Sequence, residues 1–457
     1  MPPTTGSANL EAVFKAYDVR GVVPGQLDEE LACAVGSAFV AVTGAGGSAV
    51  VVGHDMRPSS PALAAAFADG AVAAGADVRM IGLASTDELY FASGRLGLPG
   101  AMFTASHNPA QYNGIKLCRA HAVPVGMDTG LGEIRQLVAS GQRVVADRRG
   151  SIDPVDVLDD YAEHLLTLAP VTGRRLTVVV DAGNGMAGLT APAVLGRLDV
   201  DLVPMYFELD GTFPHHEANP IDPENLRDLQ RRVRETRADV GLAFDGDADR
   251  CFLVDERAEP VSPSTLTALI AARELAKEPG AKVIHNLITS RAVPQIVAEH
   301  GGIPVRTRVG HSFIKATMAE TDAVFGGEHS GHFYFRDFWR ADSGMLAALH
   351  ALAALSESDR PMSQLLSAYS RFVASGEVNS TVADQTAVMD ELEREYGGRP
   401  GVTVDHLDGL SVTHDDWWFN VRPSNTEPLL RLNVEGTDET TMSRLRDAVL
   451  ATIRRGS

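Results

Sequence analysis

Three aspartates at alternate positions, Asp245, Asp247 and Asp249, form the segment of the sequence with the most evident chemistry, and Arg250 follows them. Carboxylates spaced this closely repel one another or raise one another's pKa unless a cation lies among them. A hard divalent ion suits oxygen ligands, and Mg²⁺ typically leaves coordination positions for a phosphate oxygen. A calcium-binding EF-hand loop fits poorly, because its sixth position needs glycine and holds Arg250 here. A solvated acidic turn is the alternative without a ligand.

Ser106 stands in a polar segment, TASHNP at residues 104–109, that follows the apolar residues 101–103. The serine is therefore expected at the end of a strand, on a turn marked by Asn-Pro. A serine in such a place can act as a nucleophile or carry a phosphoryl group. The segment lacks the GxSxG pattern of hydrolases, and His107 does not become a base by adjacency alone. Taken alone, the segment is equally compatible with a helix cap or a plain turn.

Residues 326–332, GGEHSGH, also follow apolar residues and place polar groups at the end of a strand. Glu328 and Ser330 can share hydrogen bonds with sugar hydroxyls, and histidine is the usual proton carrier near neutral pH. The rival interpretation is a metal site made of Glu328, His329 and His332, although the helical HExxH frame is absent from the sequence here. A glycine-rich turn with surface histidines is the alternative without a function.

The segment RPSNTEP at residues 422–428 is rich in groups that bind phosphate. Arg422 offers a charge-assisted fork, and Ser424, Asn425, Thr426 and the backbone N–H groups of the loop add further donors. A hairpin turn explains the same composition without a ligand.

One motif points to a different class of enzyme. Residues 183–188, GNGMAG, follow a strand, open a helix and precede Glu208 by about twenty residues, as a dinucleotide-binding fingerprint does. A lone GxGxxG is weak support, and the rest of the sequence shows no other feature of a nicotinamide enzyme. We interpret the segment as a tight strand-to-helix turn near the substrate and keep an NAD-dependent dehydrogenase as the alternative.

These segments need strands and helices to hold them in place. Apolar strands at 49–54, 176–181 and 282–286 each end in a polar turn followed by a helical pattern rich in alanine and leucine, which is the βαβ signature of three successive α/β domains. Residues 402–435 alternate polar and apolar side chains, which predicts antiparallel strands packed on helices in a C-terminal α+β domain. The expected domains are residues 1–150, 151–256, 257–372 and 373–457.

The composition limits the class of protein. The chain has 457 residues with 60 acidic and 40 basic side chains, a formal charge of −20 at pH 7, and this acidity argues against binding nucleic acid. Three widely spaced cysteines exclude a disulfide framework. The sequence lacks a basic-then-apolar leader and any run of about 18 apolar residues, so we expect a cytoplasmic protein that does not enter membranes.

In this order, the segments resemble those of the α-D-phosphohexomutase superfamily, and specifically its bacterial phosphomannomutase/phosphoglucomutase branch. The similarity includes KAYDVRG at residues 15–21 and spans nearly the whole chain, with one functional loop in each expected domain. The resemblance implies three successive α/β domains with mixed sheets and a smaller C-terminal α+β domain around a central cleft.

The resemblance also implies a role for each matching residue. Ser106 is expected to carry the phosphoryl group and to bind Mg²⁺ together with the three aspartates, and Arg250 is expected beside that phosphate. Lys116 and His332 are the candidates for moving protons, with Arg20 assisting, and the choice between the two stays open. The residues expected to bind the substrate are Tyr17, His107, Lys282, His311, Glu328, Ser330, Arg422, Ser424, Asn425 and Thr426.

The implied reaction interconverts hexose 1-phosphate and hexose 6-phosphate through a phosphoserine enzyme and a hexose 1,6-bisphosphate, which also serves as activator. Mannose phosphates are the expected substrates, and the use of glucose phosphates is left open. Phosphoglucosamine mutase ranks second, because those enzymes usually carry serine in place of Thr104. An NAD-dependent dehydrogenase, a phosphatase and a non-catalytic phosphosugar-binding protein stay open as functions of different classes. The expected partner is a small phosphosugar, and the expected assembly is a monomer or a weak dimer.

Overall fold

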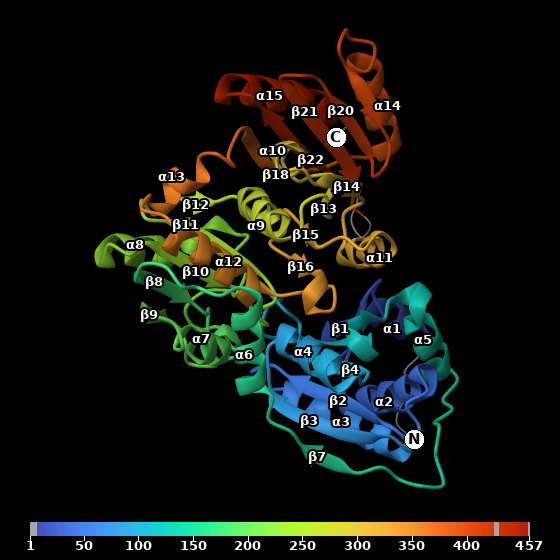
Figure 1. Cartoon of the computed structure of the whole chain (residues 1–457). Coiled ribbons are helices and arrows are strands. Elements are labelled where there is room, and N and C mark those ends of the chain that lie inside the picture. The colour runs from blue at the N-terminus through green and yellow to red at the C-terminus, as the bar shows by residue number, and fades with distance from the viewer. Residues whose placement is uncertain (1–6, 425–428, 456–457) are drawn as a thin grey trace. The chain divides into compact units, whose positions relative to one another are not determined.

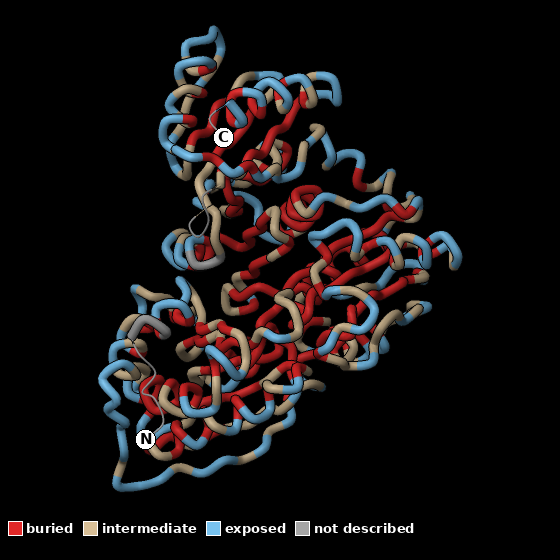
Figure 2. The backbone as a smooth tube through the Cα atoms, turned by 180° about the vertical axis from the view of Figure 1, so that it is seen from behind, coloured by how far each residue is buried: buried red, intermediate tan, exposed pale blue. Residues whose placement is uncertain are grey.

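The computed structural model describes residues 7–424 and 429–455, and Figure 1 labels its helices and strands. The chain divides into two compact units. Unit 1 comprises Met1–Ser262 and Ser330–Leu365, and unit 2 comprises Pro263–His329 and Leu366–Ser457. In both units the buried residues follow the strands and the helix faces packed on them, which appear as red segments in Figure 2. Each unit is described in turn.

The first sheet of unit 1 is mixed, with the strand order β1-β5-β4-β2-β3-β7 and β6 paired to β5. Strands β2, β3, β4 and β7 run parallel, whereas β5 is antiparallel to both β1 and β4. The strands are β1 (Asp18–Val22), β2 (Ala49–His54), β3 (Asp77–Leu83), β4 (Gly100–Phe103), β5 (Tyr112–Arg119), β6 (Val123–Pro124) and β7 (Ile152–Pro154). The helices are α1 (Ser7–Val13), α2 (Glu29–Thr43), α3 (Ser60–Ala73), α4 (Thr86–Leu96) and α5 (Leu131–Ala139).

Two glycines allow helices α2 and α3 to pack unusually close together. A Cβ atom at Gly36 would lie 2.2 Å from the carbonyl oxygen of Phe67, and one at Gly70 would lie 2.0 Å from that of Cys33. Larger residues would force these helices apart, since neither neighbour is a flexible side chain. Phe67 then packs edge-on against Phe103 at the end of β4, with ring centroids 5.5 Å apart. The helix pair thus supports the strand that leads to residues 104–109.

The second sheet of unit 1 has the order β12-β11-β10-β8-β9. Strands β8, β9 and β10 are parallel, so the turns after β8 and β10 meet at the same edge of the sheet. The elements are α6 (Leu158–Leu168), β8 (Leu176–Asp181), α7 (Ala187–Leu195), β9 (Val200–Met205), α8 (Arg227–Thr236), β10 (Val240–Phe244), β11 (Cys251–Asp255) and β12 (Pro260–Val261). The turn after β10 carries the three aspartates.

A later part of the chain completes unit 1. It contains β16 (Phe333–Phe335), β17 (Ala341–Asp342), helix α12 (Gly344–Ser356) and most of the short α13 (Met362–Leu366). Helix α12 is buried along its whole length, and Ser343 caps it by accepting a hydrogen bond from the backbone N–H of Leu346 at 3.0 Å. A Cβ atom at Gly344 would lie 2.7 Å from the carbonyl of Arg250, so this helix begins directly against the aspartate loop.

Unit 2 holds a parallel sheet segment and an antiparallel sheet. In the first, β13 (Lys282–Asn286) lies between β14 (Ile303–Thr307) and β15 (Phe325–Gly327), with helices α9 (Pro263–Lys277), α10 (Ala292–Glu299) and α11 (His311–Thr321). The antiparallel sheet has the order β18-β22-β21-β20-β19 and its own apolar core. Its elements are β18 (Val373–Thr381), α14 (Gln385–Tyr396), β19 (Thr403–Asp405), β20 (Leu410–Thr413), β21 (Trp417–Pro423), β22 (Leu429–Gly436) and α15 (Glu439–Arg455).

The predicted fold class of three α/β domains and a smaller C-terminal α+β domain is confirmed. Three successive regions combine parallel strands with helices, and the last sheet is antiparallel with two long helices. The domain limits after residues 150, 256 and 372 and the central cleft stay predictions. Within the described part of the chain, every helix is too short or too polar to cross a lipid bilayer.

Candidate active site

Ser106 lies on the turn between β4 and β5, where the sequence predicts it, and its side chain faces the second sheet of unit 1. Its hydroxyl donates a hydrogen bond to Oδ2 of Asp245 at 2.7 Å, and the Arg250 guanidinium donates to the same hydroxyl at 3.2 Å. The Ser106 backbone N–H donates to Thr104 Oγ1 at 2.9 Å. Ser106 is 5% exposed and adopts a left-handed backbone conformation, with φ at 49°. Such a conformation is rare for serine and needs support from its surroundings.

The three aspartates converge on one small space beside Ser106. Asp245, Asp247 and Asp249 are all buried, and one carboxylate oxygen of each lies within 4.8 Å of the others. Oδ1 of Asp247 and Oδ1 of Asp249 are buried and accept no hydrogen bond from any residue that the structure describes. Buried anionic oxygens without a donor are costly, so this pair of orphaned atoms favours a bound cation. The residues present therefore fit a metal ion with hard oxygen ligands.

The glycine-rich turn at residues 183–188 supports the aspartate loop. A Cβ atom at Gly185 would lie 2.7 Å from the carbonyl oxygen of Gly246, and one at Gly246 would lie 2.4 Å from that of Ser106. The carbonyl of Gly246 also accepts a hydrogen bond from the Met186 N–H at 2.9 Å. Three loops thus stack backbone on backbone. The expected tight turn is present, and it meets the site through the aspartate loop.

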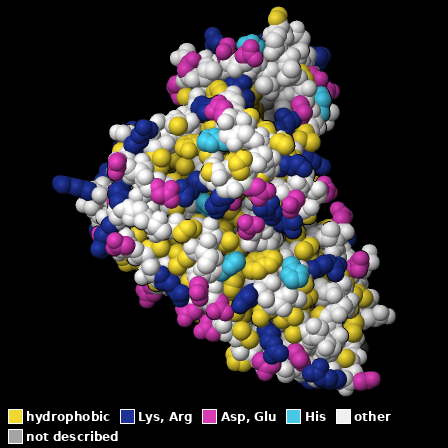
Figure 3. Space-filling model, in the orientation of Figure 1, with side chains coloured by type: hydrophobic (Ala, Val, Ile, Leu, Met, Phe, Trp, Pro, Cys, Tyr) yellow, Lys and Arg dark blue, Asp and Glu magenta, His cyan; other side chains and the backbone are white. Residues whose placement is uncertain are grey.

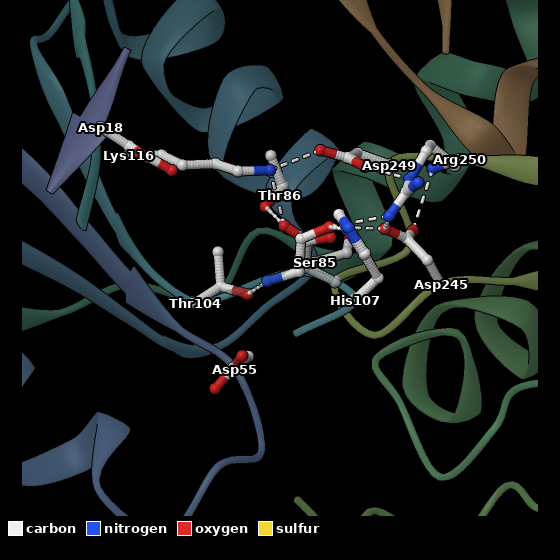
Figure 4. A network of polar contacts seen from close by, with 12 residues as sticks. Asp18, Asp55, Ser85, Thr86, Thr104, His107, Lys116, Asp245, Asp249 and Arg250 are labelled. Atoms are coloured by element: carbon white, nitrogen blue, oxygen red, sulfur yellow. Dashed lines mark hydrogen bonds and ion pairs between the residues drawn. The ribbon is translucent and has the colours of Figure 1, made fainter. Parts of the chain in front are cut away.

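Cationic side chains surround this space. Lys116 on β5 donates to Asp247 Oδ2 at 2.7 Å and to Asp249 Oδ2 at 2.6 Å, and the latter bond is drawn in Figure 4. Burial lowers the pKa of Lys116, but the two carboxylates outweigh burial and raise that pKa well above its usual value. Lys116 is therefore charged in this arrangement, with both carboxylates as its partners.

Arg250, Arg20 and His107 add to the same environment. Arg250 is 3% exposed and donates through Nε to Asp245 Oδ2 at 2.9 Å. Arg20 on β1 donates to Asn108 Oδ1 at 2.6 Å and pairs with Asp18. Burial, together with the charges of Arg250 and Arg20, lowers the pKa of His107 to about 2. His107 is therefore neutral, and its Nδ1 lies 3.2 Å from Ser106 Oγ.

His332 lies beside the aspartates with its orientation fixed by a second carboxylate. Its Nδ1 is 2.9 Å from Asp342 Oδ2 and 3.8 Å from Asp249 Oδ1, and its backbone bridges to that of Arg250. Burial disfavours the charged ring, but Asp249 and Asp342 outweigh it and raise the pKa of His332. A carboxylate on Nδ1 assigns the proton to that nitrogen in the neutral ring and leaves Nε2 able to exchange a proton. Sequence reasoning missed Asp342, which no motif marks.

In unit 2, Glu328 is buried within a second group of polar atoms. Its Oε1 accepts hydrogen bonds from Asn286 Nδ2 at 3.2 Å and from the Gly310 N–H at 3.3 Å. His311 begins α11 directly after Gly310, but its side chain lies outside the described part of the structure. The structure does not bring Lys282 to this group, because Lys282 begins β13 whereas Asn286 ends it, and its Nζ donates to Thr321 O.

The remaining predicted residues are distributed over both units. Arg422 on β21 donates to Glu377 Oε2 at 2.7 Å, and the Ser424 N–H donates to Leu429 O at 2.9 Å. Asn425 and Thr426 lie outside the described residues. Tyr17 directly precedes β1, and Ser330 belongs to unit 1, where both are partly buried.

The structure does not favour a metal site at Glu328, His329 and His332. His329 Nδ1 lies 3.3 Å from Ser264 Oγ, and His332 is engaged by Asp342. Among the side chains that the structure describes, the only groups whose geometry could hold a metal ion are the three aspartates and a neighbouring set of Asp249, His332 and Asp342. The acidic residues near Ser106 are thus the ones suited to an ion.

The sequence and structure match known proteins along almost the whole chain. Residues 11–144, 159–258 and 262–372 match the alpha/beta/alpha domains I, II and III of phosphoglucomutase/phosphomannomutase, and residues 377–452 match its C-terminal domain. A protein of Xanthomonas campestris pv. campestris named for phosphohexose mutases is 41% identical over 446 residues, which cover 97% of this chain and 99% of that protein.

Two further relatives are similar in sequence or structure. A phosphomannomutase of Escherichia coli is 39% identical over 454 residues, covering 96% of this chain and 99% of the relative. A crystal structure of a phosphoglucomutase/phosphomannomutase family protein from Burkholderia thailandensis matches with a TM-score of 0.88 and 34% identity, covering 98% of both chains. Since all four domains match in order and the relatives align nearly end to end, this chain belongs to the phosphoglucomutase/phosphomannomutase family.

Proposed function

We propose that the protein is a phosphohexomutase that interconverts hexose 1-phosphate and hexose 6-phosphate, with Ser106 as the residue that carries the phosphoryl group. One observation supports this most directly. The Ser106 hydroxyl bonds to Asp245 inside a buried group of three aspartates and also accepts from Arg250. A serine oxygen held between a metal-binding carboxylate and a guanidinium is suited to phosphoryl transfer, because the group it would carry is a dianion.

We assign Mg²⁺ to the aspartate site, with Asp245, Asp247, Asp249 and an oxygen of the Ser106 phosphate as its ligands. The ion would neutralise charge on the transferring phosphoryl group. Arg250 stays hydrogen-bonded to Asp245 and reaches Ser106 Oγ, so it can stabilise the same group. Lys116 contributes a second fixed positive charge through its bonds to Asp247 and Asp249.

In the first half of the reaction, a hydroxyl of the bound sugar attacks the phosphorus of phosphoserine. The bond between phosphorus and Ser106 Oγ breaks, and a new bond forms to the sugar oxygen, which gives a hexose 1,6-bisphosphate. Ser106 Oγ takes up one proton as it leaves, which balances the proton that the sugar hydroxyl loses. We assign the attacking hydroxyl's proton to Nε2 of His332, because Asp342 holds its Nδ1. Arg20 assists by positioning, since Asn108 and Asp18 hold its guanidinium near the serine loop.

In the second half, the bisphosphate turns around and returns its other phosphoryl group to Ser106. We assign phosphate binding to Arg422, Ser424, Asn425 and Thr426, and sugar-hydroxyl binding to Glu328 and Ser330. Arg422 is already paired with Glu377, a carboxylate in the place where an anion would bind its fork. Tyr17, His107 and His311 complete the proposed substrate contacts.

The names of the relatives suggest the substrate. The Escherichia coli relative is named a phosphomannomutase, and the Burkholderia thailandensis structure is described as a phosphoglucomutase/phosphomannomutase family protein. We therefore propose mannose phosphates as the main substrate and glucose phosphates as a second one. Phosphoglucosamine mutase activity stays the alternative within this class.

A single coupled assay tests the proposal. Purified protein with Mg²⁺ is supplied separately with mannose, glucose and glucosamine 1-phosphates, and both the 6-phosphate product and free phosphate are measured. We expect mannose 6-phosphate to form fastest, with little free phosphate. Full activity of Ser106→Ala in the presence of hexose 1,6-bisphosphate would rule out the phosphoserine. Release of free phosphate in place of isomerisation would identify a phosphatase.

We further propose that the protein works in the cytoplasm as a monomer or weak dimer, with a small phosphosugar as its partner and no nucleic acid. On the face shown in Figure 3, basic and acidic side chains are interspersed, without the continuous basic stripe that nucleic acid needs. Light scattering at several protein concentrations checks the assembly, and gel shift with duplex DNA checks the partner.

A further inference from the structure

Arg57 collects the carbonyl groups of the loop that carries Ser106. It lies just beyond β2, is 0% exposed and makes four hydrogen bonds to main-chain oxygens. Nη2 donates to Ser106 O at 2.8 Å and Asn108 O at 2.7 Å, and Nη1 donates to Pro109 O at 2.9 Å and Tyr112 O at 3.0 Å. One guanidinium thus fixes the backbone from the serine to the start of β5.

Few other side chains could replace Arg57 as the donor to these carbonyl groups. A buried carbonyl without a donor costs about 1–3 kcal/mol, and the turn between β4 and β5 is irregular backbone rather than part of a strand ladder. Only arginine offers five N–H donors in a planar fork that can reach acceptors on two sides. A lysine in the same place would carry the charge but would have three donors on a single atom.

The Arg57 charge is balanced from behind by Asp55, which is also completely buried. Arg57 Nε donates to Asp55 Oδ2 at 3.1 Å, while Asp55 Oδ1 accepts from the Arg57 N–H at 2.9 Å and from Ser60 Oγ at 2.5 Å. Burial raises the pKa of Asp55, and the neighbouring Arg57 works against that rise. The guanidinium therefore has a fixed position and direction before it meets the serine loop.

The contact to Ser106 O bears on the reacting atom. Ser106 has a φ of 49°, so the direction of its side chain depends on keeping an unfavourable backbone conformation. Arg57 holds the carbonyl on one side of this residue, and Thr104 Oγ1 accepts from its N–H on the other. The same carbonyl lies against Gly246 of the aspartate loop, where a Cβ atom would come within 2.4 Å.

The loop that follows β9 of the second sheet also holds Arg57 in place. A Cβ atom at Gly211 would lie 2.5 Å from the Arg57 Cα, and the guanidinium lies over the ring of Phe213, 5.1 Å from its centroid. Segments from both sheets of unit 1 thus enclose Arg57. This position suits a residue that sets the distance between Ser106 and the aspartates.

We propose that Arg57 is a positioning residue for Ser106: its guanidinium holds the serine loop in the conformation that directs Ser106 Oγ at Asp245. The inference rests on the proposed role of Ser106 as phosphoryl carrier. Arg57 touches backbone carbonyls rather than the transferred group, so its loss should slow the chemical step and leave substrate binding unchanged. A purely structural role would reduce stability without this selective effect.

The test compares Arg57→Lys with a matched variant, Arg119→Lys. Arg119 also donates to two carbonyls, Val42 O at 3.2 Å and Thr129 O at 3.1 Å, but these lie away from the serine loop. Both variants are assayed with mannose 1-phosphate for kcat and KM, for Ser106 phosphorylation by hexose 1,6-bisphosphate, and for thermal unfolding. We expect Arg57→Lys to lower kcat and the rate of Ser106 phosphorylation about 10²-fold, with KM within about twofold of the parent. Arg119→Lys should leave both kcat and the phosphorylation rate unchanged.

Two outcomes would overturn the proposal. One is a kcat for Arg57→Lys within about twofold of the parent, and the other is an effect confined to KM. If Arg57→Lys does not fold, Asp55→Asn replaces it as the test, because asparagine keeps the shape of the partner but frees the Arg57 guanidinium. A lowered kcat at constant KM supports the positioning role, and an unchanged kcat rejects it. Ser106→Ala separates the proposed role of Arg57 from the proposed role of Ser106. Full activity of that variant would show that no phosphoserine takes part in the reaction, whatever Arg57 does.

Discussion

Ser106 and Asp245 are joined by a hydrogen bond of 2.7 Å from Oγ to Oδ2, although 139 residues separate them in the chain. The serine comes from the turn after β4 of one sheet and the aspartate from the turn after β10 of the next. Both turns follow strands with parallel neighbours, and polar residues at the carboxyl ends of such strands gather at one edge of each sheet. Unit 1 thus joins two such edges into one site.

Removal of the metal should abolish activity reversibly. Asp247 and Asp249 each keep a buried oxygen that accepts no hydrogen bond within the described structure, so these atoms are available to an ion. We expect EDTA to stop the conversion of mannose 1-phosphate and added Mg²⁺ to restore it. Asp247→Asn should raise the Mg²⁺ concentration for half-maximal activity at least about tenfold. Unchanged Mg²⁺ dependence in that variant would contradict the ligand assignment, and Asp153→Asn, at a partly exposed pair with Arg79, is the control.

Asp342 should control proton transfer through His332. Its carboxylate lies 2.9 Å from Nδ1, so Asp342→Asn removes the group that orients the ring and selects its tautomer. We expect kcat to fall about 10²–10⁴-fold while KM changes little. The exposed Asp337, which pairs with the neighbouring Arg336, offers a matched Asp→Asn control. Equal kcat values for the two variants would remove His332 from the proposed proton path.

The residue types of the site could be predicted from the sequence, but several of its supports could not. Ser106 and the aspartates stand in short polar segments after apolar runs, so periodicity locates them. Arg57 acts on carbonyl oxygens, which every residue has, and such acceptors leave no trace in residue types. Asp342 is near in space to His332 through a strand pairing rather than through a motif.

Strand direction explains why Lys282 lies away from the other polar groups of unit 2. Lys282 and Asn286 belong to the same short apolar strand, and the sequence pattern alone treats its two ends alike. In the structure, the carboxyl end with Asn286 meets Glu328, whereas Lys282 meets Thr321 at the other end. A lysine at the start of a parallel strand lies at the edge opposite to the one that usually binds ligands. If the rule that parallel strands bind ligands at their carboxyl ends is added to the sequence pattern, Lys282 is expected at the end of its strand away from Glu328.

Arg422 should contribute to binding rather than to chemistry. Its fork donates to Glu377 Oε2 at 2.7 Å, and Arg431 on the neighbouring strand donates to Oε1 of the same carboxylate at 3.3 Å. Arg422→Lys keeps the charge but loses the planar fork, so we expect KM for mannose 1-phosphate to rise about tenfold with a smaller change in kcat. Arg431→Lys, which also loses a bond to Glu377, is the control and should leave KM within about twofold. A rise of equal size in both variants would assign the effect to Glu377 rather than to substrate phosphate.

Glu88 should make stability depend on pH. It is 2% exposed at the start of α4, and burial, together with the nearby Asp87, raises its pKa to about 8 from a usual 4.5. Below pH 4.5 the Glu88 carboxyl is protonated in both the folded and the unfolded state, and the stability that the neutral carboxyl contributes is fully present. Between pH 4.5 and 8 the unfolded chain releases this proton while the folded protein keeps it, so that stability is lost. The free energy of unfolding should therefore fall as pH rises through this window and level off above it.

The variant Glu88→Gln tests this origin of the pH dependence. It keeps an acceptor for the Ser85 N–H, which bonds to Glu88 in the parent, and removes the titration. In urea unfolding, the free energy of unfolding should fall between about pH 5 and 8 in both proteins. We expect the fall to be smaller in this variant than in the parent by on the order of 2–4 kcal/mol. The exposed control Glu133→Gln should follow the parent. Parallel curves for the Glu88→Gln variant and the parent would mean that Glu88 is already ionised in the fold.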